Sequence, residues 1–269
     1  MNGVGGKCAL SKCAAFERRN SWQCSKCSAE MNGGIVFVTG ISGSDVEGFL
    51  HAVVKEASTA SREHKVAVHD IGGMMKKFAE EDDPDVQWNR VLDADERVLR
   101  HLRAMAFLEL KHAIQSRPDT LHLVDLHLAF RWAAYLTRGF DPHILEAFNP
   151  HVRIFINIIE DLPKVQERLK KTAWGDRTIL ELLLWRDEEL FLTNLFADTC
   201  GRVDCIAVAR GEPAALLERL IWHPEIKKVY LSFPITGILQ DEAARREIEE
   251  FRDRIREFLI VFDPYACCR

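Results

Sequence analysis

The chain has 269 residues, of which 47% are hydrophobic and 29% are charged, and its formal net charge is −5. This composition predicts a soluble globular protein with a sizeable core, and the negative charge argues against a broad nucleic-acid-binding surface. No apolar run is long enough to span a membrane and no signal-peptide core follows Met1, so we expect a cytoplasmic protein without a membrane partner.

The N-terminal segment, residues 1–31, is marked by four cysteines with the spacing C-x4-C-x10-C-x2-C, namely Cys8, Cys13, Cys24 and Cys27. Four thiolates can hold Zn²⁺ tetrahedrally, and this spacing is near that of small zinc modules, although the first pair is wider than usual. The alternative is a disordered leader, because Met31-Asn32-Gly33-Gly34 looks like a second start. We therefore expect either a zinc module or a leader here.

A glycine-containing turn follows the first expected strand, Ile35–Thr39, and leads into a helix at Asp45–Ala57. This is the setting of a P-loop, whose usual pattern is Gly-x4-Gly-Lys-Ser/Thr. Counted from Gly40, the second glycine, the lysine and the hydroxyl residue are replaced by Asp45, Val46 and Glu47. The context therefore predicts nucleotide binding, while the charge that assists phosphoryl transfer is missing.

The backbone of this loop can still cradle phosphates through its N–H groups and the start of the following helix. The residues that we expect to bind the nucleotide there are Gly40, Ser42, Gly43 and Ser44. A lysine from elsewhere, such as Lys55 or Lys76, is one way to replace the missing charge. The plainer alternative is an ordinary turn between a strand and a helix.

Strands and helices alternate after this loop. Strands are expected at Lys65–Val68, Leu121–Val124, Val152–Ile159 and Val203–Ala209, and helices at Met74–Glu80, Asp93–Gln115, Phe140–Phe148, Leu162–Lys171, Arg177–Asp198 and Pro213–Ile221. The alternation predicts a three-layer α/β domain over residues 32–222, with a mostly parallel sheet flanked by helices.

A shorter βαβ unit is expected within residues 226–269. It comprises a strand at Lys227–Phe233, a helix at Asp241–Phe258 and a strand at Leu259–Phe262. About 40 residues are too few for an independent domain of this class. The unit therefore either extends the first sheet or opens a second domain.

The order of these elements resembles that of the P-loop nucleotide kinases, in particular the adenylate-kinase-like branch. The stretches that carry the resemblance are Phe37–Gly43, His69–Gly72, Val124–His127 and Asp161–Glu188, within residues 32–222. The resemblance implies ATP and Mg²⁺ as cofactors, with Asp125 ordering the metal, Asp70 near the acceptor nucleotide, and Arg177 and Arg186 closing on phosphates from a lid. The plainer alternatives are turn-capping aspartates and a solvated basic helix face.

The C-terminal unit resembles the opening of the nucleoside 2-deoxyribosyltransferases through Val229–Pro234 and Phe262-Asp263-Pro264. That family's catalytic glutamate comes later in the chain, and nothing here can be matched to it. An incomplete sheet edge would favour a homodimer or docking on the first domain.

The sequence thus predicts a nucleotide-binding P-loop protein, a nucleoside or nucleotide kinase that transfers a phosphoryl group from ATP. The alternative is a catalytically impaired nucleotide-sensing or scaffold module.

Overall fold

The computed structural model describes residues 33–59, 65–132, 135–148, 151–201, 203–233 and 241–268. The four cysteines expected to bind zinc, Cys8, Cys13, Cys24 and Cys27, lie outside the described residues. Within the described ranges, none of the helices is both long enough and apolar enough to cross a membrane.

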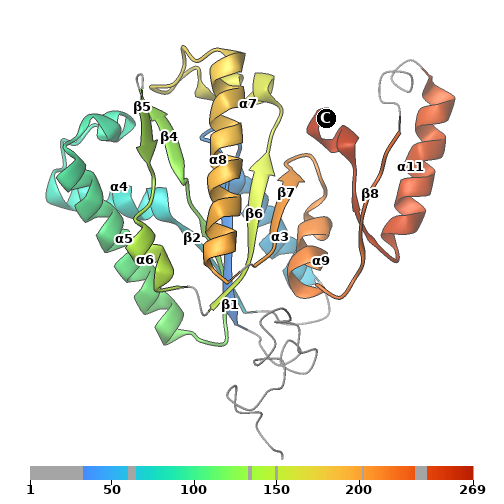
Figure 1. Ribbon diagram of the computed structural model, residues 1–269, viewed down its shortest axis with the longest axis horizontal. Coiled ribbons are helices and arrows are strands. Elements are labelled where there is room, and N and C mark those ends of the chain that lie inside the picture. Colours follow the sequence, from blue (N-terminus) through green and yellow to red (C-terminus); the bar gives the residue numbers. More distant parts are fainter. Residues whose placement is uncertain are drawn as a thin grey trace, which may run out of the picture.

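A five-stranded parallel sheet forms the centre of the fold (Figure 1). Its strands are β1 (Gly34–Thr39), β2 (Val66–Asp70), β3 (Leu121–Asp125), β6 (Val152–Ile159) and β7 (Cys205–Ala209), in the order β2-β3-β1-β6-β7. Every neighbouring pair is parallel. The predicted α/β class with a parallel sheet flanked by helices is therefore confirmed.

Alternate side chains of the central strand enter two different cores, because successive residues of a strand point to opposite faces. Val36 and Val38 pack with α3 (Val46–Thr59) and α9 (Ala214–Trp222). Ile35 and Phe37 pack with α4 (Ile71–Asp82), α5 (Glu96–Ser116) and α8 (Ile179–Thr199). Burial of both faces explains why β1 is apolar at every position from Ile35 to Val38.

Three short segments differ from the sequence-based expectation. Residues 129–138 form an unpredicted antiparallel hairpin of β4 (Ala129–Trp132) and β5 (Tyr135–Arg138). The helix expected over Phe140–Phe148 is limited to α6 (Pro142–Glu146), which begins at a proline, a residue favoured in the first turn of a helix. Phe140 and Phe148, on either side of α6, are buried in the core beside α5 and α8. A 3₁₀ helix, η2 (Trp88–Asp93), precedes α5 and was also not predicted.

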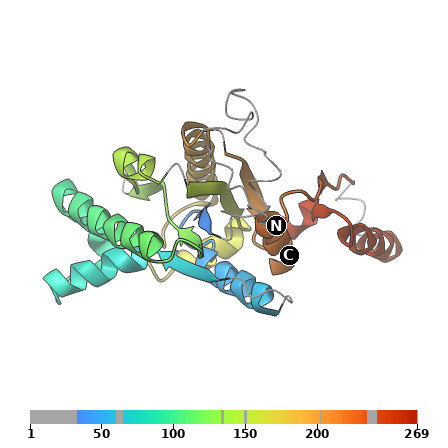
Figure 2. The ribbon, with the colours of Figure 1, turned by 90° about the horizontal axis from the view of Figure 1, so that it is seen from below.

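The C-terminal unit forms its own small sheet and does not extend the five-stranded one. Its elements are β8 (Lys228–Tyr230), α11 (Glu242–Arg256), β9 (Ile260–Phe262) and the 3₁₀ helix η4 (Pro264–Cys268), with β8 and β9 parallel. Ile260 joins the core formed by α3 and α9. Figures 1 and 2 place this unit at the end of the molecule opposite α4 and α5.

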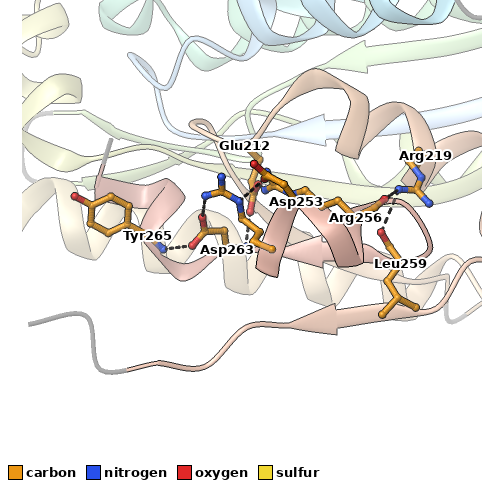
Figure 3. A network of polar contacts seen from close by, with 8 residues as sticks. Glu212, Arg219, Asp253, Arg256, Leu259, Asp263 and Tyr265 are labelled. Carbon is orange, nitrogen blue, oxygen red and sulfur yellow. Dashed lines mark hydrogen bonds and ion pairs between the residues drawn. The ribbon is translucent and has the colours of Figure 1, made fainter. Parts of the chain in front are cut away.

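A buried carboxylate in the turn after β7 holds the C-terminal unit in place (Figure 3). Glu212 is 4% exposed and accepts hydrogen bonds from the backbone N–H of Asp263 at 2.6 Å and from Arg256 at 2.7 Å. Burial raises the pKa of Glu212, while these two donors oppose the rise. Next to it, a Cβ on Gly211 would stand 2.1 Å from the carbonyl oxygen of Ala266, so the two backbones are in close contact.

Candidate functional site

The carboxyl ends of the five parallel strands define the edge where the candidate site lies. From the central strand β1 the chain continues to β2, which is the strand at one edge of the sheet. From β6 it continues to β7, which is the strand at the opposite edge. Ligands of open α/β sheets bind where neighbouring strands diverge in this way. The loop after β1, residues 40–45, stands at this point.

Two residues of the loop, only one of them a glycine, have the positive φ angles that glycine adopts most readily. Gly43 has φ of +87°, and the N–H of Ser44 closes a turn onto the carbonyl of Ile41 at 3.0 Å. Asp45, which stands at the second glycine of the P-loop pattern, has φ of +57°. Aspartate is among the few L-residues that adopt this left-handed conformation at moderate cost.

The position of the P-loop lysine is filled by an apolar side chain. Val46 is 5% exposed and belongs to the core beneath α3. One of its methyl groups lies 3.0 Å from the place that a Cβ on Gly40 would take. The side chain therefore packs against the start of the loop, and no charge is available from this position.

Two arginines that are distant in sequence contact the loop. Arg168, from α7 (Leu162–Leu169), donates to the carbonyl oxygen of Gly43 at 2.8 Å and to Glu160 at 2.8 Å. Arg210, from the turn after β7, donates to a carboxylate oxygen of Asp45 at 2.7 Å. The negative charge of Asp45, which by itself would repel a phosphate, is thus offset by a cation.

The two lysines considered as replacements do not take this role. Lys76 lies 3.6 Å from Glu80 on its own helix. Lys55 is exposed and lies nine residues beyond Val46 in α3, about 14 Å along the helix axis. The basic side chains at the loop are therefore guanidinium groups, which suit bidentate pairing with phosphate oxygens.

A chain of buried polar groups supports the end of β1. Asn157 of β6 donates to the hydroxyl of Thr39 at 2.8 Å, and the hydroxyls of Thr39 and Thr193 are 2.8 Å apart. The hydroxyl of Thr193 donates to the carbonyl of Glu189 at 2.7 Å, so Thr39 must be the donor to Thr193. β1, β6 and α8 are thereby fixed to one another directly below the loop.

Acidic side chains dominate the same edge of the sheet. Asp70 and Asp125 are register partners at the ends of β2 and β3. Burial, with added repulsion from Asp70 and Glu47, raises the pKa of Asp125 to about 8. At neutral pH the Asp125 carboxyl is therefore largely protonated, and a cation bound there would have to displace its proton.

Two further residues at this edge were not predicted. Glu189 of α8 is fully buried and accepts the backbone N–H groups of Leu128 and Ala129, each at 2.8 Å. Burial raises its pKa to about 8, although these two donors act in the opposite direction. His127 donates from Nδ1 to the carbonyl of Gly40, and burial lowers its pKa. Both side chains tie the segment after β3 to the loop and to α8.

The expected lid arginines pair with acidic residues near them in the sequence, Arg177 just before α8 and Arg186 within it. Arg177 is 2.9 Å from Glu181, and Arg186 is 3.6 Å from Asp187. The arginine of this basic zone that contacts the loop is Arg168. Ser42 and Ser44 lie in the turn, and the Ser44 hydroxyl is buried without a hydrogen-bond partner among the described residues.

The three tryptophans of this region pack with protein side chains. Trp185 is fully buried and donates to the carbonyl of Ala129, and Trp174 stands between it and Trp132. In the described part of the chain, no group of three or more His, Cys, Asp or Glu side chains is placed to hold a metal ion.

No family model matches the chain, and no curated protein matches its sequence. Among solved structures, the crystal structure of TT1252 from Thermus thermophilus is similar over 66% of this chain and 88% of that chain, with 12% sequence identity and a TM-score of 0.36. A likeness at this level carries no inference about function.

Proposed function

We propose that this chain binds the phosphate groups of a nucleotide at the loop of residues 40–45 and acts as a nucleotide-sensing or scaffold module. The observation that carries the non-catalytic part is the burial of Val46 at the lysine position, at 5% exposure. Phosphoryl transfer depends on positioned positive charge that neutralises the transferring group. A buried valine cannot supply that charge.

Three features support phosphate binding. The left-handed residues Gly43 and Asp45 give the loop a curved backbone at the start of α3, where N–H groups and the helix dipole favour anions. Arg168 and Arg210 contact the loop from two different elements. The buried hydroxyl of Ser44 is unpartnered among the described residues, and a phosphate oxygen would satisfy it.

The phosphate has to compete with carboxylates that already contact these arginines. Glu160 is 2.8 Å from Arg168, and Asp45 is 2.7 Å from Arg210. Arg210 and Asp45 are both partly exposed, so this pair is weak enough to exchange for a doubly charged phosphate. Glu160 is only 5% exposed, so Arg168 would keep that contact and reach a phosphate with its remaining N–H donors. We therefore expect modest affinity that falls as the salt concentration rises.

Mg²⁺ would be held by carboxylate oxygens of Asp125 and Asp70, which suit this hard cation. The ion would relieve the repulsion between the two groups and stabilise charge on the bound phosphates. Because the pKa of Asp125 is raised to about 8, metal binding at neutral pH would release a proton.

Phosphoryl transfer from ATP is the second candidate function. The two guanidinium groups favour it, because an arginine beside the phosphates can stabilise transition-state charge. Turnover in a phosphoryl-transfer assay distinguishes this candidate from the sensing module.

The proposed function is tested by the change in melting temperature on adding ATP, ADP or AMP, with and without Mg²⁺. A nucleotide-dependent rise that is lost in the Arg168→Ala, Arg210→Ala double variant and retained in Arg246→Ala supports it, since Arg246 is an exposed residue of α11 paired with Glu242. No shift with any nucleotide refutes nucleotide binding. Measured turnover refutes the non-catalytic reading in favour of the kinase.

A further inference from the structure

Helix α8 carries a stripe of exposed apolar side chains along the side that faces away from its core. The stripe consists of Leu180, Leu184, Phe191 and Leu195, which are 64%, 44%, 66% and 46% exposed. The opposite side of the same helix is buried through Leu182, Trp185, Glu189, Thr193 and Phe196. The helix is therefore apolar on two sides, and only one of them is covered by the described residues.

The stripe is symmetric about its centre. Leu180 and Leu195 lie equally far from the peptide bond between Asp187 and Glu188, and so do Leu184 and Phe191. A two-fold interface uses the same patch on both subunits, so each residue has to meet its counterpart across the axis. This spacing is self-complementary when two copies of α8 run antiparallel.

We propose that the α8 stripe is the interface of a homodimer, with a two-fold axis between Asp187 and Glu188. In this arrangement Leu180 contacts the partner's Leu195, and Leu184 contacts the partner's Phe191. Ridges of apolar side chains from the two helices then interdigitate as in other antiparallel helix pairs.

The charges at the centre of the stripe fit this partner. Asp187 is 3.6 Å from Arg186, and Glu188 accepts a hydrogen bond from Arg131 at 2.7 Å. Each acid at the two-fold axis therefore already has a positive neighbour within its own chain. The axis consequently does not bring together two uncompensated carboxylates, which would oppose association.

The interface is small, which determines the kind of dimer to expect. A helix of 21 residues is about 31 Å long, and two such helices bury less than the roughly 1,200 Å² of a standard interface. We therefore expect a dimer that forms at high protein concentration and dissociates on dilution.

Sedimentation across a range of protein concentrations tests the dimer and its location. The native chain should move from monomer to dimer as concentration rises, and Phe191→Glu should weaken association at least tenfold. Phe258→Glu is the matched control, because Phe258 is 74% exposed in the C-terminal unit. A native chain that stays monomeric, or a Phe191→Glu variant that dimerises as well as the control, refutes the proposal.

Disulfide formation tests the antiparallel register. Across the proposed axis, two copies of position 187 are offset by about 1.5 Å along the helices, whereas two copies of position 194 are offset by about 20 Å. Asp187→Cys should therefore form a disulfide-linked dimer on mild oxidation, above the background of the native cysteines, and Asn194→Cys should not. Equal cross-linking at both positions, or cross-linking at position 194 alone, overturns this geometry.

Discussion

Replacing Asp125 with asparagine should make the protein more stable at neutral and alkaline pH. Burial, Asp70 and Glu47 raise the pKa of Asp125 from 3.8 to about 8, so the folded protein holds a proton that the unfolded chain releases. The resulting stability is complete below about pH 4 and is lost as the pH rises towards about 8. Each pKa unit corresponds to about 1.4 kcal/mol, which limits the loss between pH 5 and 8 to about 4 kcal/mol. Solvent reaches part of this side chain, so we expect roughly half, about 2 kcal/mol.

Urea unfolding of the native chain and of Asp125→Asn at pH 5, 6, 7 and 8 measures this effect. The difference in unfolding free energy should grow by about 2 kcal/mol in favour of the variant across this range. Asp119→Asn, which makes the same substitution at an exposed position before β3, is the matched control. If the curves for Asp125→Asn and the native chain run parallel, the assignment of a raised pKa to this carboxyl is wrong.

Three further predictions concern other parts of the fold. Glu212→Ala should cost about 3 kcal/mol and expose residues 226–268 to trypsin earlier, because it removes the buried carboxylate that accepts from the backbone N–H of Asp263 and from Arg256. The exposed Glu242→Ala should change neither. Gly43→Ala should lower the melting temperature more than Gly201→Ala. Both glycines have φ near +87°, but only a Cβ at position 43 would press against α7. Equal decreases in melting temperature would show that contact with α7 adds nothing to the backbone strain. Burial lowers the pKa of His69 to about 4, so in this pH range the unfolded chain binds a proton that the folded protein excludes. The unfolding free energy measured in urea falls from pH 6.5 to 4 for this reason, and His69→Gln should reduce that fall by about 2 kcal/mol. An equal fall in the native chain and the variant would contradict this.

The sheet and its first loop could be predicted because their signals are local. The run Ile35–Val38 is apolar at every position, as expected for a strand that is buried on both faces, and Gly40 and Gly43 mark the turn that follows it. Asp70 and Asp125 were placed at strand ends, and their register partnership follows from parallel pairing of β2 with β3. Fold class and the candidate edge of the sheet therefore needed no tertiary information.

The groups that surround the loop could not be predicted, because they come from distant parts of the chain. Arg168 and Arg210 are separated from their loop partners by 125 and 165 positions in the sequence. No sequence pattern indicates that residues so far apart are in contact. Glu189 follows another acid, Glu188, yet it is fully buried. Its spacing of four residues from Trp185 was the one local sign that it belongs to the inward face of α8.

The turn of residues 210–212 is constrained in length as well as in composition. Arg210 reaches the loop at Asp45, Gly211 lies against the backbone of η4, and Glu212 holds the C-terminal unit. Surface turns commonly accept insertions and deletions, since their ends are fixed and their middle is solvated. Here each of three consecutive residues has a different partner, so one residue added or removed would break contacts on both sides. This turn is therefore a poor place to divide the chain for circular permutation, or to insert a tag.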